Sequence, residues 1–90
     1  MPPVVIYTRA LCSYCIWAKE LLHCKHVRFD EIDVTGNPEL RAEMIRRAEG
    51  RTTTPQILIG STPIGGCDEL YALERTGRLD ALLTQPAGDG

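Results

Sequence analysis

Two short apolar segments separated by one amphipathic segment lie near the N-terminus, and their order constrains the fold more than any other feature. The β-branched run Val4–Thr8 suits a strand that is buried on both faces. In residues 13–23 apolar side chains recur at helical spacing, which predicts a helix that begins at or next to Cys12. Alternating side chains over residues 27–34 predict a second strand. Such a β-α-β unit joins parallel neighbouring strands through a right-handed crossover.

A second helix is predicted after the turn sequence TGNP. Asn37 is expected to cap this helix, and Pro38 suits its first position because proline has no amide hydrogen to lose there. Gly50 is expected to end it. The apolar residues of the segment mark one face, at Leu40, Met44, Ile45 and Ala48.

The rest of the chain predicts a hairpin followed by two helical segments. These elements are expected at residues 55–60, 62–66, 67–77 and 78–83. The order β-α-β-α-β-β-α-α predicts an α/β fold with a four-stranded mixed sheet flanked by helices. We expect a single domain over residues 1–84 and a frayed tail over residues 85–90, because the tail has nothing to bury.

Composition and charge narrow the class of protein. A chain of 90 residues is enough for one small domain with a modest core. The net charge of -2 and the scattered basic residues give no electrostatic reason to expect nucleic acid or an anionic membrane as a partner. Neither a signal peptide nor a run of about 18 apolar residues is visible. We therefore expect a cytoplasmic protein whose four cysteines are kept reduced. We also expect a monomer.

The motif Cys12-Ser13-Tyr14-Cys15 falls in the first turn of the first predicted helix. Free backbone amides and the positive end of the helix dipole favour a negative charge there, and Arg9 adds a nearby cation. An unperturbed thiol is only about 3% ionised at pH 7, so a lowered pKa greatly increases the reactive form. Cys15 lies one turn deeper on the same face and is expected to be more buried and less acidic. This asymmetry suits an attacking thiol followed by a resolving thiol.

Zinc binding is the competing interpretation of these cysteines. Cys12, Cys15, His23 and His26 form a C-x2-C-x7-H-x2-H pattern, but zinc fingers need a longer separation between the pairs and between the histidines. A helix would also carry His23 about 16 Å along its axis from the first cysteine. We therefore expect no metal site of this kind. Cys24 is interpreted as a small apolar filler or a partly exposed spectator, and Trp17 as either core or surface.

Three stretches resemble a known family: YTRALCSYC at residues 7–15, TTTPQILI at residues 52–59 and IGGCDELYAL at residues 64–73. Together they resemble a glutaredoxin of the dithiol class, and the resemblance covers almost the whole chain. It implies a thioredoxin-like fold. It also implies an enzyme that uses glutathione to reduce protein disulfides and, more efficiently, protein-glutathione mixed disulfides.

The resemblance assigns roles to individual residues. Cys12 matches the nucleophile and Cys15 the resolving cysteine, and the peptide bond before Pro55 is expected to be cis. Arg9, with Gln56 or Arg51, would face the glycyl carboxylate of glutathione. The implied glutathione site consists of Arg9, Tyr14, Thr54, Pro55, Gly66, Cys67 and Asp68.

Ser13 departs from the family's common Cys-Pro-Tyr-Cys motif. Serine restores an amide hydrogen that proline lacks, and its hydroxyl can bond to sulfur. Some relatives without this proline resemble iron-sulfur carriers, in which two copies and two glutathiones hold a cluster through the first cysteine of each motif. This alternative would make Cys12 a cluster ligand. A thioredoxin-like reductase supplied by a flavoenzyme is a third and weaker alternative.

Overall fold

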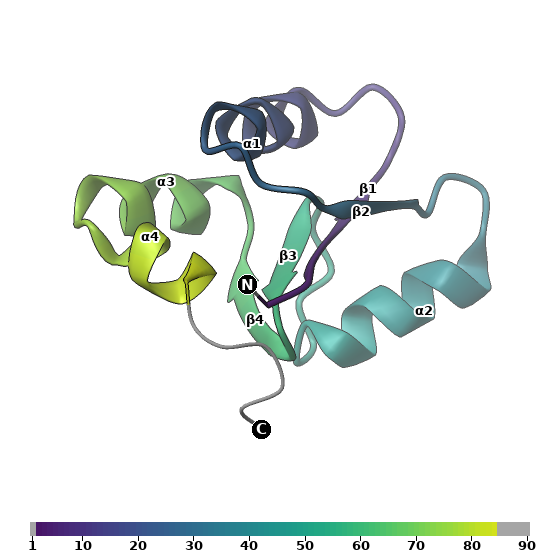
Figure 1. Cartoon of the computed structure of the whole chain (residues 1–90). Coiled ribbons are helices and arrows are strands. Elements are labelled where there is room, and N and C mark those ends of the chain that lie inside the picture. The colour runs from purple at the N-terminus through teal and green to yellow at the C-terminus, as the bar shows by residue number, and fades with distance from the viewer. Residues whose placement is uncertain (1, 85–90) are drawn as a thin grey trace.

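The computed structural model describes residues 2–84, so the predicted frayed tail at residues 85–90 lies outside the described part (Figure 1). Within residues 2–84 no helix is long and apolar enough to cross a membrane. The strands and helices alternate in the predicted order: β1 (Val4–Thr8), α1 (Ser13–Cys24), β2 (Asp30–Asp33), α2 (Pro38–Arg47), β3 (Gln56–Ile59), β4 (Thr62–Gly65), α3 (Cys67–Arg75) and α4 (Arg78–Leu83).

The four strands form one mixed sheet in the order β2-β1-β3-β4. β1 pairs parallel with β2 and antiparallel with β3, and β3 forms an antiparallel hairpin with β4. The predicted α/β fold with a four-stranded mixed sheet is therefore confirmed. The parallel pair requires the crossover through α1, whereas the antiparallel pairs need only a return of the chain or a short turn.

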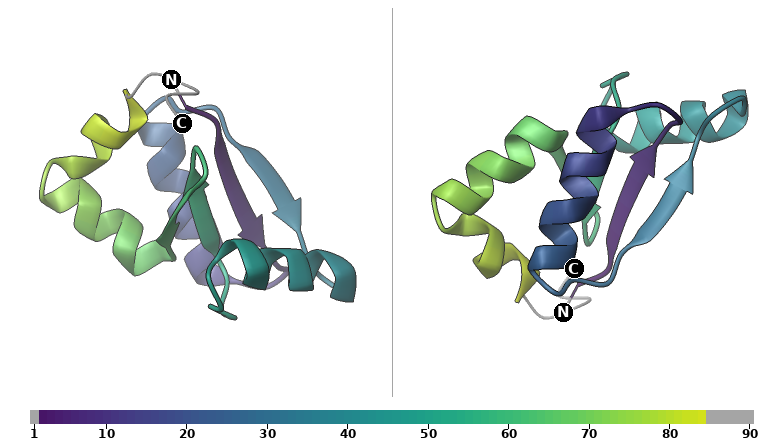
Figure 2. Two further views of the ribbon diagram at one scale, coloured as in Figure 1. Left: turned by 90° about the horizontal axis from the view of Figure 1, so that it is seen from below. Right: turned by 90° about the horizontal axis from the view of Figure 1, so that it is seen from above.

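Helices cover both faces of the sheet. α1, α3 and α4 pack on one face, and α2 lies alone on the other (Figure 2). Successive side chains of β1 point to opposite faces of the sheet. Val4 and Ile6 pack in the core between the sheet and α1 and α3, while Tyr7 packs in the core between the sheet and α2. Because both faces of β1 are covered, its sequence VVIYT does not alternate between apolar and polar residues.

The predicted second strand is shorter than expected. Residues 27–29 and Val34 do not belong to it, because pairing with β1 runs from Val5 opposite Asp30 to Thr8 opposite Asp33. His26 adopts a left-handed conformation with φ of 58°, and the amide of Val27 donates to the carbonyl of Leu22 at 3.0 Å. Val27 then enters the core from this turn. The apolar alternation therefore reflects core packing at a helix end and not a longer ladder.

The start of α2 is as predicted. Asn37 is its N-cap, with the side chain accepting the amide of Leu40 at 3.0 Å, and Pro38 occupies the first turn. The helix ends at Arg47, three residues before Gly50, because Glu49 and Gly50 both have positive φ, 59° and 95°.

Candidate active site

Cys12 is the N-cap of α1, directly after β1 and its connecting turn. Its backbone is extended, with φ of -117° and ψ of 105°, and its Sγ accepts the amide of Cys15 at 3.2 Å. The sulfur therefore takes the place that a serine or aspartate oxygen usually fills at a helix start. The side chains of Cys12 and Cys15 are 8% and 2% exposed, so the first cysteine is the more accessible of the two.

The two thiols differ in acidity in opposite directions. Burial acts to raise the pKa of Cys12, but hydrogen bonds from the Cys15 thiol, Thr54 and the Cys15 amide outweigh it, and with Arg9 they hold that pKa below its usual value. For Cys15, burial and the neighbouring Cys12 raise the pKa to about 11. Cys12 is thus the thiol that ionises first, which matches the asymmetry expected from the spacing of the motif.

The loop before β3 borders the Cys12 sulfur. The Thr54-Pro55 peptide bond is cis, as the resemblance implied. The Cys12 thiol donates to the Thr54 carbonyl at 3.8 Å, and the Thr54 hydroxyl lies 3.7 Å from the same sulfur. A hydroxyl in this position can donate to the sulfur once Cys12 is deprotonated.

The N-terminus of α3 approaches this loop closely. A Cβ at Gly66 would lie 3.0 Å from the carbonyl oxygen of Pro55, so the close approach depends on glycine. The Gly66 amide donates to Glu69 Oε1 at 2.6 Å. Cys67 is buried, and this burial raises the pKa of its thiol. The thiol of this third cysteine therefore ionises less readily than that of Cys12.

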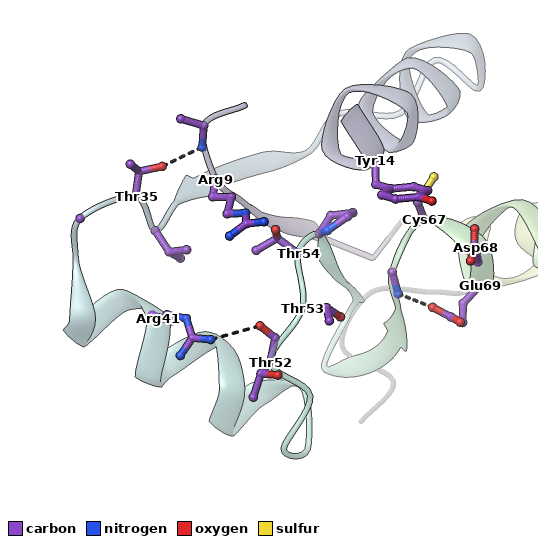
Figure 3. A pocket seen from close by; sticks show the side chains of 15 residues that line it. Arg9, Tyr14, Thr35, Arg41, Thr52, Thr53, Thr54, Cys67, Asp68 and Glu69 are labelled. Atoms are coloured by element: carbon purple, nitrogen blue, oxygen red, sulfur yellow. Dashed lines mark hydrogen bonds between the residues drawn. The ribbon is translucent and has the colours of Figure 1, made fainter. Parts of the chain in front are cut away.

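A groove of about 790 Å³ joins these elements. Figure 3 shows Arg9, Tyr14 and Thr54 around it, with Cys67 and Asp68 on the α3 side. Cys12 does not line the groove itself, but Thr54, which does, contacts its sulfur. All seven residues of the implied glutathione site meet in this groove: Arg9, Tyr14, Thr54, Pro55, Gly66, Cys67 and Asp68.

The two alternatives offered as partners of Arg9 do not line the groove. Gln56 is only 2% exposed, and its Nε2 donates to the Thr53 carbonyl at 2.9 Å, so the side chain is held inside the protein. Arg51 is exposed but is not part of the lining. Arg41 of α2 lines the groove instead and donates to the Thr52 carbonyl at 3.4 Å (Figure 3). Sequence reasoning missed Arg41 because no motif surrounds it.

The histidines of the zinc interpretation lie far along α1 and beyond its end. His23 and His26 are both exposed. Cys24 is exposed as well, so of its two interpretations the apolar filler is wrong and the exposed spectator agrees with the structure. Within residues 2–84, His, Cys, Asp and Glu side chains form no group of three or more that is suited to a metal ion.

Known proteins resemble this chain in sequence and in structure. The glutaredoxin family model matches residues 4–64. A glutaredoxin of Pseudomonas aeruginosa is 66% identical over 84 residues, which covers 93% of this chain and 99% of that protein. The solution structure of a Brucella melitensis glutaredoxin has a TM-score of 0.81 and 59% identity, covering 92% of this chain and 89% of that one.

A more distant structure adds a ligand to the comparison. The crystal structure of a buckwheat glutaredoxin-glutathione complex has a TM-score of 0.82 at 29% identity, and covers 92% of this chain and 77% of that one. The four-stranded sheet, the acidic cysteine at the start of α1 and the adjoining groove thus occur in a chain whose relatives are named glutaredoxins along nearly its whole length. The chain therefore belongs to the glutaredoxin family and is a thiol-disulfide oxidoreductase.

Proposed function

We propose that the enzyme reduces protein-glutathione mixed disulfides and protein disulfides with glutathione as the electron donor. The observation that carries this proposal is the lowered pKa of Cys12 next to the groove. Thr54 lines the groove and contacts the Cys12 sulfur. A thiol with a lowered pKa beside a groove suits nucleophilic attack on a small disulfide that binds in the groove.

The lining of the groove offers a suitable group for each part of glutathione. The loop at Thr54 and Pro55 offers backbone groups to the cysteinyl part of the tripeptide, in the manner of an added strand. Arg9 and Arg41 provide two cations at one end for the glycyl carboxylate. At the other end Asp68 provides a carboxylate for the γ-glutamyl ammonium group. The glutathione complex of the buckwheat relative supports this assignment.

The γ-glutamyl carboxylate is expected at the start of α3. Helix N-termini bind anions because their first amides have no partner within the helix. The Gly66 amide already donates to Glu69 Oε1, so the amides of Cys67 and Asp68 are the ones we assign to this carboxylate.

The monothiol cycle uses Cys12 alone. Its thiolate attacks the glutathione sulfur of the mixed disulfide, the old S-S bond breaks, and the protein sulfur leaves with the electron pair and takes up a proton. A second glutathione thiolate then attacks the sulfur of the Cys12-bound glutathione. The products are oxidised glutathione and the regenerated Cys12 thiolate, so two electrons pass from glutathione to the substrate.

The dithiol route also uses Cys15. Cys12 attacks a protein disulfide and releases the first protein thiolate, and Cys15 then attacks the Cys12 sulfur and releases the second, which leaves a Cys12-Cys15 disulfide. Two glutathiones reduce this disulfide by two successive exchanges, which regenerates both thiols and yields oxidised glutathione. Burial raises the pKa of Cys15 first, and its hydrogen bond and charge interaction with Cys12 raise it further. The last two effects disappear once Cys12 is bonded to substrate. Formation of the mixed disulfide therefore favours ionisation of the resolving thiol.

Turnover of a glutathionylated peptide tests the proposal when NADPH consumption is followed through glutathione reductase. We expect Cys12→Ser to abolish turnover and Cys15→Ser to spare it, while Cys15→Ser impairs reduction of a protein disulfide. Cys24→Ser is the matched control because that exposed cysteine lies at the far end of α1. Equal loss of both activities in Cys15→Ser would contradict the division of roles, and an inactive wild type would reject glutathione-dependent reduction.

The alternative function is a glutathione-ligated iron-sulfur cluster shared by two copies. Cys12 fits a cluster ligand because its thiolate is favoured. In the arrangement that the resemblance implies, each copy contributes this one cysteine, so a second copy and two glutathiones complete the ligand set. Leu11 and Tyr14, 103% and 53% exposed, are apolar side chains next to Cys12 that a second copy would cover. Brown colour and a dimer after anaerobic purification with glutathione would support this alternative, and a colourless monomer would reject it.

A further inference from the structure

A second cleft, of about 490 Å³, opens between α1 and α3 on the outer surface of the protein. These two helices pack side by side on one face of the sheet (Figure 2). The cleft is lined by Tyr14, Trp17, Cys67, Asp68, Tyr71 and Arg75. It shares Tyr14, Cys67 and Asp68 with the glutathione groove, so it continues that groove past the Tyr14 ring. We refer to it as the α1-α3 cleft.

The α1-α3 cleft presents a fixed aromatic surface. The rings of Tyr14 and Trp17 meet edge to face, with centroids 5.4 Å apart and planes at 88°. The Tyr71 hydroxyl donates to the Trp17 carbonyl at 3.1 Å and ties the two helices together at the base of the cleft. Tyr14 and Trp17 remain 53% and 48% exposed, so both residues are accessible to a partner. Little ordering is needed before such a surface binds an apolar group.

A positive charge marks the end of the cleft away from the groove. Arg75 is exposed and takes part in none of the ion pairs within residues 2–84. From Cys67 to Arg75 α3 rises by about 12 Å, which is the length of three to four residues of extended chain. The cleft therefore suits a short peptide segment with an apolar residue near the aromatic rings and an acidic residue near the guanidinium group.

The proposed reaction requires such a segment to lie close to Cys12. A mixed disulfide has a glutathione half and a protein half, and glutathione fills the groove. The protein half must then leave the groove, and the α1-α3 cleft is its continuation beyond Tyr14. The sulfur of the protein half is the leaving group when Cys12 attacks the glutathione sulfur.

We propose that the α1-α3 cleft binds the substrate segment that flanks the glutathionylated cysteine, and that Trp17 and Arg75 select segments with an apolar and an acidic residue. This inference rests on the proposed function. It adds a determinant of substrate choice that the chemistry at Cys12 does not need. Small mixed disulfides that lack a peptide should therefore react independently of Trp17 and Arg75.

The test compares five substrates by kcat/KM in the NADPH-coupled assay. One is the mixed disulfide of glutathione with 2-mercaptoethanol. The other four are glutathionylated peptides that carry a Leu-Glu pair or a Ser-Lys pair, placed either before or after the cysteine. The cleft variants are Trp17→Ala and Arg75→Glu. Their matched controls are Ile16→Ala, which truncates an equally exposed apolar neighbour outside the cleft, and Arg78→Glu, which makes the same charge change on α4.

We expect the wild type to have a higher kcat/KM for a Leu-Glu peptide than for the corresponding Ser-Lys peptide. This preference should appear for only one of the two positions of the pair, before or after the cysteine. Trp17→Ala should lower kcat/KM for that peptide about tenfold, the effect of losing one well-covered apolar contact. Arg75→Glu should lower it about two- to fivefold, because an exposed ion pair contributes little. Both control variants should leave kcat/KM for the Leu-Glu peptide unchanged. None of the four variants should change kcat/KM for the mixed disulfide of glutathione with 2-mercaptoethanol.

Each contrary result has a distinct meaning. Equal rates for all the peptides, or equal losses in cleft and control variants, would overturn the role of the cleft while the proposed function stands. A loss in Trp17→Ala that also affects the small disulfide would show a general defect and overturn the inference. A wild type that is inactive on the small disulfide would reject the proposed function and the inference with it.

Discussion

The hydroxyl of Thr54 is expected to contribute more to the reactivity of Cys12 than the charge of Arg9 does. The hydroxyl lies 3.7 Å from the Cys12 sulfur, and its hydrogen bond is a larger cause of the lowered pKa than the charge of Arg9. Thr54→Val keeps the branched shape of the side chain and removes only the hydroxyl. The perturbation therefore isolates one donor to the thiolate.

The expected magnitude follows from the geometry. Hydrogen bonds to charged groups contribute about 1.5–3 kcal/mol, and a contact near the distance limit for sulfur should contribute about 1 kcal/mol. The thiolate population at a pH well below the pKa of Cys12 should then fall roughly fivefold. Arg9 is exposed, so water and salt screen the effect of its charge on Cys12. Arg9→Gln should therefore change the thiolate population of Cys12 no more than about twofold, and less at high salt.

The assay is the rate of alkylation by iodoacetamide as a function of pH. Cys24→Ser serves as the background because that cysteine is exposed and would react as well. Thr52→Val is the matched control, since this exposed threonine lines the same groove but makes no contact with the Cys12 sulfur. An unchanged rate in Thr54→Val, or a larger loss in Arg9→Gln, would refute the reasoning.

Three further predictions concern packing, pH and capping. Gly66→Ala places a Cβ 3.0 Å from the Pro55 carbonyl, so the free energy of unfolding in urea should fall by about 1–2 kcal/mol and KM for glutathione should rise; unchanged values would contradict the close approach. The Thr8 hydroxyl donates to Glu31 at 2.7 Å and is the largest cause of the lowered pKa of that carboxyl. Because the folded-state pKa is the lower one, this stabilisation is present above the ordinary value of 4.5 and is lost as pH falls through the folded-state value. Thr8→Val should therefore be less stable at pH 7 and lose less stability on acidification, whereas parallel stability curves would disprove the link. Asn37→Ala removes the Oδ1 that accepts an amide at 3.0 Å and should cost about 1 kcal/mol in urea unfolding, and no loss would show that the cap is dispensable.

The fold could be predicted largely from local patterns. The strand Val4–Thr8, the cap at Asn37 and the hairpin before α3 each depend on residues close together in sequence. The beginning of β2 could not be predicted in this way. The sequence pattern predicts Val27 as the first residue of a strand, but Val27 is buried in the core at the end of α1. Pairing of β2 with β1 starts only at Asp30, opposite Val5. Register depends on the partner strand, which a single segment does not contain.

The candidate site shows the same division. Motifs with local spacing indicated Cys12, Cys15 and the start of α3, and the structure brings their surroundings into one groove. Local motifs did not predict the positions of Gln56 and Arg41 correctly. Gln56 neighbours the loop in sequence but faces inward, since successive strand residues point to opposite sides. Arg41 is distant in sequence and reaches the groove because α2 starts beside it.

The sequence alone determined the order of the elements and the chemistry of the motif, because helix capping and three-residue spacing act within a single turn of the chain. Only the tertiary structure decided which groups surround the Cys12 sulfur and how strongly each one acts. Thr54 lies 42 residues away in sequence, yet its hydroxyl lies 3.7 Å from the Cys12 sulfur. Hydrogen bonding and burial are short-range in space, so they depend on the packing of distant segments and not on their separation along the chain.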